Sequence, residues 1–292
     1  MRLAELWARG LARVMDAVRV NAVALEVREG VSLWHKRRRL GMGAVIAAGN
    51  VFLRLSRSRI RMFPSAKHWR DWELSSFALL HPGRTAEARG THAVALEALP
   101  GERLDLLLAR GRLTQAMVEA AARELHRAHG LRQPRASHPW SHGDAHLKNL
   151  LYDEAGQRAW LIDFETEHDA HLSADERHAD DLFVFLLDLR GRTTREEALC
   201  LARAFLCAYV EPGVLDALRA RLRPPRGLAR ALWMSRSHHL PEAELLEWLE
   251  DLRRGGDPGP CSRTPGAKVG GHAAESRTPD DSVRVGASDA RT

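Results

Sequence analysis

Two stretches decide the fold of this chain: Ser141-His142-Gly143-Asp144-Ala145-His146-Leu147-Lys148-Asn149 and Leu161-Ile162-Asp163-Phe164-Glu165. Short apolar runs at residues 150–152 and 160–162 flank a turn, so a β-hairpin is predicted to join the two stretches. Asp144 and Asn149 then lie in a loop, and Asp163 lies at the end of the next strand. Phosphoryl transfer needs such groups, because it uses a carboxylate near the attacking hydroxyl and oxygen ligands for Mg²⁺.

Composition limits the class of protein. The chain has 292 residues, 45% hydrophobic and 28% charged, with a net charge of +6, which is typical of a soluble globular protein. This excludes a disulfide miniprotein, a fibre and a wholly disordered chain. The longest apolar stretch, residues 41–53, is too short to cross a bilayer, and charges interrupt the N-terminal residues where an export signal would be apolar.

The three cysteines, Cys200, Cys207 and Cys261, are too few and too scattered for a disulfide framework or a zinc finger. We expect Cys200 and Cys207 to be packed core thiols. A reducing compartment fits this usage. The sequence therefore predicts a cytoplasmic protein, with a peripheral position on the inner face of a membrane as a further possibility.

The first 98 residues mix helical and β patterns. We expect an amphipathic helix over residues 2–20 and a hairpin formed by residues 22–28 and 31–36 around Glu29-Gly30. Residues 41–62 fit neither pattern. A helical rhythm then runs from Trp69 to Leu80 and stops at His81-Pro82-Gly83.

The remainder of the chain is mainly helical. A strand over residues 92–99 is followed by a long helix over 114–129, with Thr114 as its N-cap. Helical patterns continue from Asp180 to about residue 252. Residues 255–292 contain almost no large apolar side chains, so we expect a disordered tail. Strands and helices do not alternate, so the fold class is α+β.

The two motifs resemble the catalytic loop and the metal-binding motif of the protein-kinase-like superfamily, in the H-G-D-x-H-x-x-N form of aminoglycoside and choline phosphotransferases. By this resemblance Asp144 is the catalytic carboxylate, and Asn149 and Asp163 bind Mg²⁺ and, with it, ATP. We place His142, as a brace of the loop, and His146 with Asp144 in the catalytic group. Lys148 also belongs near the site.

The resemblance also implies a bilobal architecture. A reduced β-rich N-lobe would occupy residues 1–98, and a mainly helical C-lobe would occupy residues 99–254. Asp181, in Asp180-Asp181-Leu182, is predicted to open a helix. It would then either hold the catalytic loop, as an acid often does in this superfamily, or act as a simple N-cap.

The nucleotide phosphates require a lysine that pairs with a glutamate on the following helix. Glu73 lies on the predicted helix, and a lysine strand, a basic insertion and a W-x-x-W-E helix resemble the lipopolysaccharide core heptose and Kdo kinases. Lys36 is the favoured lysine, Lys67 is the second candidate, and a plain solvated charge is the third interpretation. A G-x-G-x-x-G loop does not precede the hairpin; a single turn at Gly30 takes its place.

Residues 28–70 carry eleven basic residues against Glu29 alone. Apolar residues among the arginines favour an anionic membrane surface or glycolipid as a partner, and a solvated face is the plainer interpretation. Nucleic acid is a poor candidate, because Phe52 and Phe63 are too sparse to form stacking platforms.

The sequence thus predicts ATP- and Mg²⁺-dependent transfer of a phosphate to a hydroxyl, preferably of a sugar or a lipopolysaccharide-type glycolipid. The alternatives are a small-molecule kinase of the aminoglycoside or choline type and an atypical protein serine/threonine kinase. The rival from another class is a pseudokinase that binds or scaffolds without catalysis.

Overall fold

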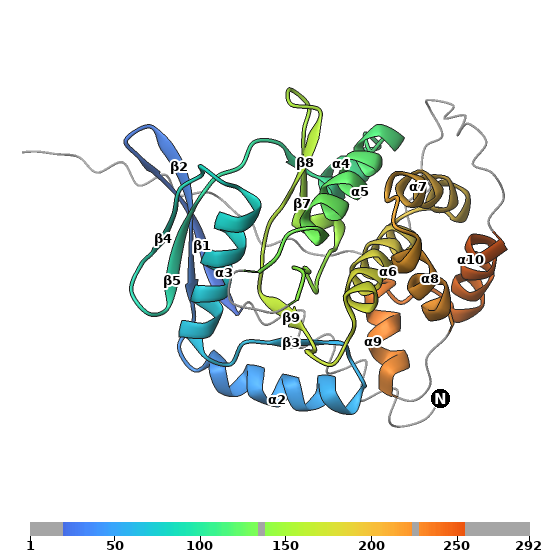
Figure 1. The fold of residues 1–292 in the computed structure, drawn as a ribbon, viewed down its shortest axis with the longest axis horizontal. Coiled ribbons are helices and arrows are strands. Elements are labelled where there is room, and N and C mark those ends of the chain that lie inside the picture. Colours follow the sequence, from blue (N-terminus) through green and yellow to red (C-terminus); the bar gives the residue numbers. More distant parts are fainter. Residues whose placement is uncertain (1–19, 134–137, 224–227, 255–292) are drawn as a thin grey trace, which may run out of the picture. The chain divides into compact units, whose positions relative to one another are not determined.

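The computed structural model describes residues 20–133, 138–223 and 228–254 (Figure 1). The strands are β1 (Asn21–Arg28), β2 (Val31–Arg38), β3 (Ile60–Met62), β4 (Ala86–Ala88), β5 (Ala93–Glu97), β6 (Glu102–Arg103), β7 (Leu150–Asp153), β8 (Arg158–Leu161) and β9 (Thr166–His168). The helices are α2 (Met42–Leu55), α3 (Ala66–Leu80), α4 (Leu104–Ala109), α5 (Gln115–His129), α6 (Ala174–Arg192), α7 (Arg195–Ala208), α8 (Pro212–Arg221), α9 (Leu228–Arg236) and α10 (Glu242–Arg254), with a 3₁₀ turn at Leu147–Asn149.

The predicted α+β class is confirmed, with antiparallel strands gathered in the N-terminal part and helices in the C-terminal part (Figure 1). The described residues belong to one compact unit, and the lobe boundary at residue 98 stays a prediction. The helix predicted over residues 2–20, apart from residue 20, and the tail predicted over 255–292 lie outside the described residues.

The N-terminal sheet has the strand order β1-β2-β5-β4, and its neighbouring strands are antiparallel. The predicted hairpin is confirmed. Its two turn residues, Glu29 and Gly30, have φ angles of 53° and 81°, which is the backbone that tight two-residue hairpin turns require. The hairpin places Lys36 opposite Val23 and next to Val94 of the buried central strand.

Helix α3 packs against this sheet and confirms the predicted helical rhythm. The side chain of Ser65 caps its first turn by accepting a hydrogen bond from the N–H of His68. Trp69 and Phe77 are buried on the side of the helix that faces the sheet core. This packing also fixes Glu73, one turn from each of them, in the molecular interior.

The ambiguous residues 41–62 form α2 and β3. Asn50 of α2 joins the two elements, because its side chain donates to the carbonyl of Met62 at 2.8 Å and accepts from the N–H of Met62 at 2.9 Å. Strand β3 then pairs with β9, so that Ile60 lies opposite His168. A segment from the N-terminal part therefore lies against the region that follows the D-F-E motif.

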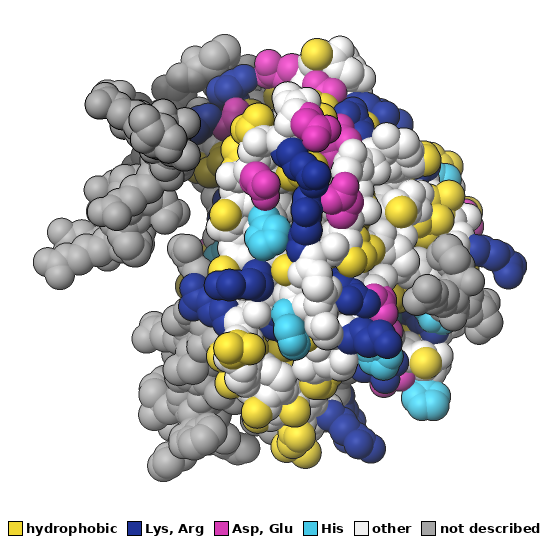
Figure 2. Space-filling model, turned by 90° about the vertical axis from the view of Figure 1, so that its left-hand side faces the viewer, with side chains coloured by type: hydrophobic (Ala, Val, Ile, Leu, Met, Phe, Trp, Pro, Cys, Tyr) yellow, Lys and Arg dark blue, Asp and Glu magenta, His cyan; other side chains and the backbone are white. Residues whose placement is uncertain are grey.

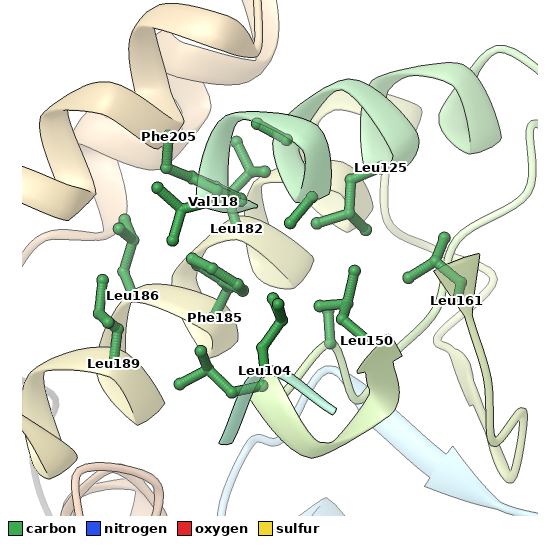
Figure 3. Close-up of a cluster of buried hydrophobic side chains, with 14 of the residues drawn as sticks. Leu104, Val118, Leu125, Leu150, Leu161, Leu182, Phe185, Leu186, Leu189 and Phe205 are labelled. Atoms are coloured by element: carbon green, nitrogen blue, oxygen red, sulfur yellow. The ribbon is translucent and has the colours of Figure 1, made fainter. Parts of the chain in front are cut away.

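The C-terminal core is formed where α5, α6 and α7 meet the β7–β8 hairpin (Figure 3). Phe185 of α6 stacks on Phe205 of α7 with their ring centroids 4.0 Å apart. Burying one such aromatic or leucine side chain contributes about 1.5–3 kcal/mol. The labelled members of this core are Leu104, Val118, Leu125, Leu150, Leu161, Leu182, Phe185, Leu186, Leu189 and Phe205.

Two expectations about this part are wrong. Asp180 and Asp181 do not open a helix, because α6 begins at Ala174 with a complete capping box formed by Ser173 and Glu176. Cys207 is exposed rather than packed in the core, since it lies on the outer side of α7.

The helix over residues 114–129 and its Thr114 cap are confirmed. Across the described ranges, the helices are too short or too polar to cross a membrane.

Candidate active site

Lys36 of β2 lies at the centre of a carboxylate cluster. Its Nζ is 2.6 Å from Oε1 of Glu73 on α3 and 2.8 Å from Oδ1 of Asp163. Burial by itself would lower the pKa of Lys36, but the charges of Asp163 and Glu73 outweigh this effect and hold it above its ordinary value. The ammonium group is therefore charged at neutral pH. Lys67, by contrast, is exposed at the start of α3.

The backbone of the catalytic loop is held by a buried carboxylate on α6. The N–H groups of His142 and Gly143 each donate to Asp181 at 2.7 Å, and Nε2 of His129 lies 3.1 Å from the same carboxylate. Asp181 is fully buried in the interior of α6. It therefore holds the loop, as the resemblance implied, and the simple N-cap interpretation is wrong.

Gly143 is required by its surroundings. Its φ angle is 81°, and a Cβ at this position would lie 2.5 Å from Oγ1 of Thr166. That hydroxyl in turn donates to the carbonyl of His142 at 3.1 Å. The close approach of β9 to the loop thus depends on the missing side chain.

Asp144 and His146 form a pair within the loop. Nε2 of His146 is 3.0 Å from Oδ1 of Asp144, and its Nδ1 is 3.6 Å from Oδ1 of Asp188. Burial would raise the pKa of Asp144, but the charge of His146 outweighs it and holds this pKa well below its ordinary value. Burial likewise opposes the charged form of His146, yet Asp144 raises its pKa to about 9. Both side chains are ionised at neutral pH.

Asp188 is a positioning residue that the sequence analysis missed. It is fully buried on α6 and accepts from the N–H of Leu147 at 2.9 Å and from Arg192 at 2.8 Å. Nε2 of His238 lies 2.5 Å away. Its position seven residues after Asp181 places both acids on one face of the helix, and that spacing was the available signal.

His142 and Asn149 connect the two motifs. Nε2 of His142 donates to the carbonyl of Ile162 at 3.0 Å, while its Nδ1 accepts from the N–H of Asp144 at 3.2 Å, which fits the tautomer with its proton on Nε2. The N–H of Ile162 donates to the carbonyl of Asn149 at 3.0 Å. The residue before Asp163 is therefore fixed to the catalytic loop on both sides.

Asn149 and Asp163 provide oxygen atoms suited to Mg²⁺. Nδ2 of Asn149 donates to the backbone and to the carboxylate of Asp144 at 2.8 and 3.2 Å, so its carbonyl oxygen remains available. Asp163 has a φ angle of 70°, a strained backbone that is common at functional sites. An amide and a carboxylate oxygen fit a hard cation that also binds phosphate oxygens. Among the described residues, no three His, Cys, Asp or Glu side chains form a metal site by themselves.

Two further charged groups lie near these carboxylates. Lys148 is exposed. The charge of Asp144, and to a lesser extent that of Asp163, raises its pKa, so Lys148 lies close to both carboxylates. Glu165 has a pKa raised to about 8 by burial and by the charge of Asp163. The side chain of Asn21 donates to Glu165. The predicted site residues thus come together in one cluster.

The lysine strand paired with a helix glutamate, the H-G-D loop held by an α6 acid, and the D-F-E turn after a hairpin are the parts that the resemblance implied. The α+β chain thus has the arrangement of parts that the resemblance to the protein-kinase-like superfamily implies.

Known structures similar to this chain include two kinases. The Plasmodium vivax ethanolamine kinase is 10% identical, aligned over 83% of this chain and 84% of that chain, with a TM-score of 0.39. The bifunctional kinase-methyltransferase WbdD is 15% identical, aligned over 76% of this chain and 45% of that chain, with a TM-score of 0.35. No family model and no curated protein sequence matches the chain.

Proposed function

We propose that this chain is an ATP- and Mg²⁺-dependent phosphotransferase with a hydroxyl group as acceptor. The observation that carries the proposal is the position of Lys36, which contacts both Glu73 and Asp163 within 2.8 Å. A cation between a helix carboxylate and a candidate metal ligand is the arrangement that nucleotide phosphates need.

The remaining groups take the other tasks of the reaction. Asn149 and Asp163 would hold Mg²⁺, which supplies charge neutralisation on the phosphate oxygens. Asp144 orients the acceptor hydroxyl by accepting its hydrogen bond. Its low pKa suits orientation better than early proton removal, because phosphoryl transfer proceeds through a loose transition state with little demand for a strong base. His146 keeps Asp144 ionised and in place.

An apolar surface beside Lys36 would receive the nucleotide base. The strand register places Val23, Leu25 and Trp34 on the same face of the sheet as Lys36. These three side chains are 54, 53 and 43% exposed, whereas large apolar groups on a sheet face are usually covered. A flat aromatic base could pack against Trp34 and Leu25.

A pseudokinase would bind or scaffold without transferring phosphate, so it would release no ADP from Mg·ATP. The intact set of Lys36, Asp144 and Asp163 favours catalysis over scaffolding. ADP release in the presence of Mg·ATP, with candidate alcohols as acceptors, separates the two: the enzyme should release ADP, and Asp144→Asn should lower this rate by at least about 100-fold. Full activity of the variant would contradict the role of Asp144.

For the acceptor, we propose a sugar or a glycolipid. A small alcohol and a protein hydroxyl are the alternatives. The same ADP-release assay separates the three classes by the acceptor that is added. Free sugars and lipid-linked sugars should support ADP release, whereas amino alcohols and peptides should not.

We also propose that α2 binds an anionic membrane surface. Val45, Val51 and Leu55 are 40, 59 and 66% exposed on this helix, and Arg54 lies beside them. Figure 2 shows apolar and basic side chains next to one another on the lower part of the sheet side of the molecule. Apolar groups among arginines suit a lipid interface. Sedimentation with vesicles that contain phosphatidylglycerol should decrease in Val51→Asp and stay unchanged in Glu119→Gln.

A further inference from the structure

A cavity of about 260 Å³ lies between the loop that follows α2 and the helices α6, α8 and α9. Phe183 and Trp233, both almost fully buried, form its apolar wall. The charged lining consists of five arginines and one carboxylate: Arg57, Arg59, Arg221, Arg223, Arg236 and Asp180. The cavity is therefore strongly cationic.

The carboxylates near the cavity are fewer than these arginines: Arg59 is paired with Glu176 at 3.5 Å, and Asp180 is the other carboxylate. Asp180 is shared, because Arg221 forms an ion pair with it and Nη1 of Arg236 lies 4.0 Å away. Arg57 and Arg223 have no ion-pair partner among the described residues. Positive charge gathered in a concave site with apolar, low-dielectric walls attracts anions, because such walls focus the electric field.

Four lining residues also carry a buried donor without a hydrogen-bond partner among the described residues: Ser56 Oγ, Arg59 Nη1, Arg221 Nη1 and Trp233 Nε1. Nearly all buried donors in folded proteins have partners. Unpaired donors of three residue types around one cavity indicate a ligand that is rich in acceptor oxygens.

The cavity is connected to the catalytic loop through one histidine. Nε2 of His168 lies 3.2 Å from Oδ2 of Asp180, and its Nδ1 lies 2.8 Å from Oγ of Ser141, the first residue of the S-H-G-D stretch. The neighbouring Asp181 holds the loop backbone. A ligand that alters the Asp180 cluster thus acts close to the reacting groups.

We propose that this cavity binds the phosphate, or a similar multiply charged oxyanion, of a small molecule. Arginines bind such groups through paired, charge-assisted hydrogen bonds. The anion belongs either to the acceptor substrate, an assignment that rests on the proposed function, or to a free phosphorylated compound that changes the rate. A positively charged alcohol is repelled by the same residues.

Pyrophosphate is the probe for the binding test. Arg57 and Arg223 are exposed and unpaired, so the double variant Arg57→Asn/Arg223→Gln should fold; asparagine tolerates the φ angle of 52° at position 57. Calorimetric titration should show affinity weakened about tenfold or more for each lost arginine. Arg61→Gln, an exposed arginine paired with Glu167 outside the cavity, should bind as the wild type does.

Mg·ATP titration of the same proteins separates this proposal from the proposed function. The double variant should keep wild-type affinity for Mg·ATP while it loses affinity for pyrophosphate. If wild type and variants all fail to bind Mg·ATP, the proposed nucleotide site is contradicted, and the cavity assignment is not. Equal pyrophosphate affinity in wild type and double variant, or binding to an adventitious ion site that the variant leaves intact, would overturn the cavity assignment.

Kinetics distinguish the two sources of the anion. If the acceptor carries it, the double variant raises KM for phosphorylated alcohols and leaves their unphosphorylated counterparts unaffected. If a free compound carries it, pyrophosphate changes kcat with an unphosphorylated acceptor, and the double variant abolishes that change. Identical kinetics of both proteins under both conditions would show that the cavity has no part in the reaction.

Discussion

Nζ of Lys36 lies 2.6 Å from Oε1 of Glu73, although 37 positions separate the two residues. Glu73 is fully buried, and its second carboxylate oxygen has no hydrogen-bond partner among the described residues. A buried carboxylate that loses its cation costs several kcal/mol. Lys36 therefore connects the stability of the fold to the nucleotide site.

Replacing Lys36 should affect stability and nucleotide binding together. We expect Lys36→Met to lower the free energy of unfolding by about 3 kcal/mol, because Glu73 remains buried and unpaired, and to abolish binding of Mg·ATP. Urea denaturation and nucleotide titration measure the two effects. The control Lys67→Met should change neither.

The double variant Lys36→Met/Glu73→Leu tests the reason for the loss. Removing the orphaned carboxylate should restore most of the stability and none of the nucleotide binding. Wild-type Mg·ATP affinity in Lys36→Met would rule out Lys36 as the nucleotide lysine.

Gly143→Ala should be destabilising beyond its backbone strain. A left-handed alanine costs about 1–2 kcal/mol, and its Cβ would also overlap Oγ1 of Thr166 at 2.5 Å. Gly111→Ala is the matched control, because φ is 66° there and nothing lies within 4 Å of the added Cβ. The midpoint of thermal unfolding should drop further in Gly143→Ala, and Thr166→Ala should recover part of the difference. Equal effects at both glycines would refute the close contact.

Asp181→Asn should loosen the catalytic loop. An amide has one acceptor oxygen, so one of the two loop N–H groups loses its partner, at about 1–3 kcal/mol. The amides of His142 and Gly143 should exchange hydrogen faster, and ADP release should slow. Asp175→Asn, an exposed substitution on the same helix, should leave exchange at the loop unchanged; a similar effect in both variants would point to α6 as a whole.

Acid should destabilise the fold through its buried histidines. Burial lowers the pKa of His81 to about 4 and that of His178 to about 3, against about 6.5 in the unfolded chain. The unfolded state binds more protons between these values, so the contribution of each of these two histidines is complete above pH 6.5 and is lost as the pH drops towards 3. Each histidine contributes up to about 1.4 kcal/mol per pH unit. Urea midpoints across this range measure the slope, and His81→Phe should reduce it.

At alkaline pH the fold should lose stability through His146, whose folded-state pKa is raised rather than lowered. The pKa of His146 is raised to about 9, so its ion pair with Asp144 contributes stability below pH 6.5 that is lost as the pH rises through about 9. We expect the phosphotransfer rate to be flat near neutrality and to fall above about pH 9. A rate that keeps rising beyond pH 10 would show that a charged His146 is not needed.

The local parts of the site were predictable from the sequence. Asp144, Asn149 and Asp163 are recognisable because the loop, the hairpin and the following strand are contiguous in the chain. Lys36 could be favoured over Lys67 because a lysine strand, a basic insertion and a W-x-x-W-E helix resemble the lipopolysaccharide core kinases. The structure places Lys36 on β2 of the predicted hairpin. The pairing of Lys36 with Glu73 then follows from the packing of α3 on the sheet.

The long-range parts were not predictable. Strand β3 pairs with β9 more than a hundred residues later, and no local pattern specifies that partner. The start of α6 was predicted too late, at Asp180, although Ser173 and Glu176 form a capping box seven residues earlier. The contacts of Asp188 and the grouping of the cavity arginines depend on helices that are distant in the sequence and meet only in the folded chain.

Binding of Mg·ATP to wild type and Asp163→Asn tests the account most directly. Asparagine accepts the φ angle of 70° at this position, so the variant keeps the fold while it loses the carboxylate charge. Thermal unfolding with and without Mg·ATP should show a clear upward shift for wild type, dependent on Mg²⁺, and little or none for the variant. A wild-type protein that shows no shift, or a variant that shifts equally, would contradict the proposed kinase site.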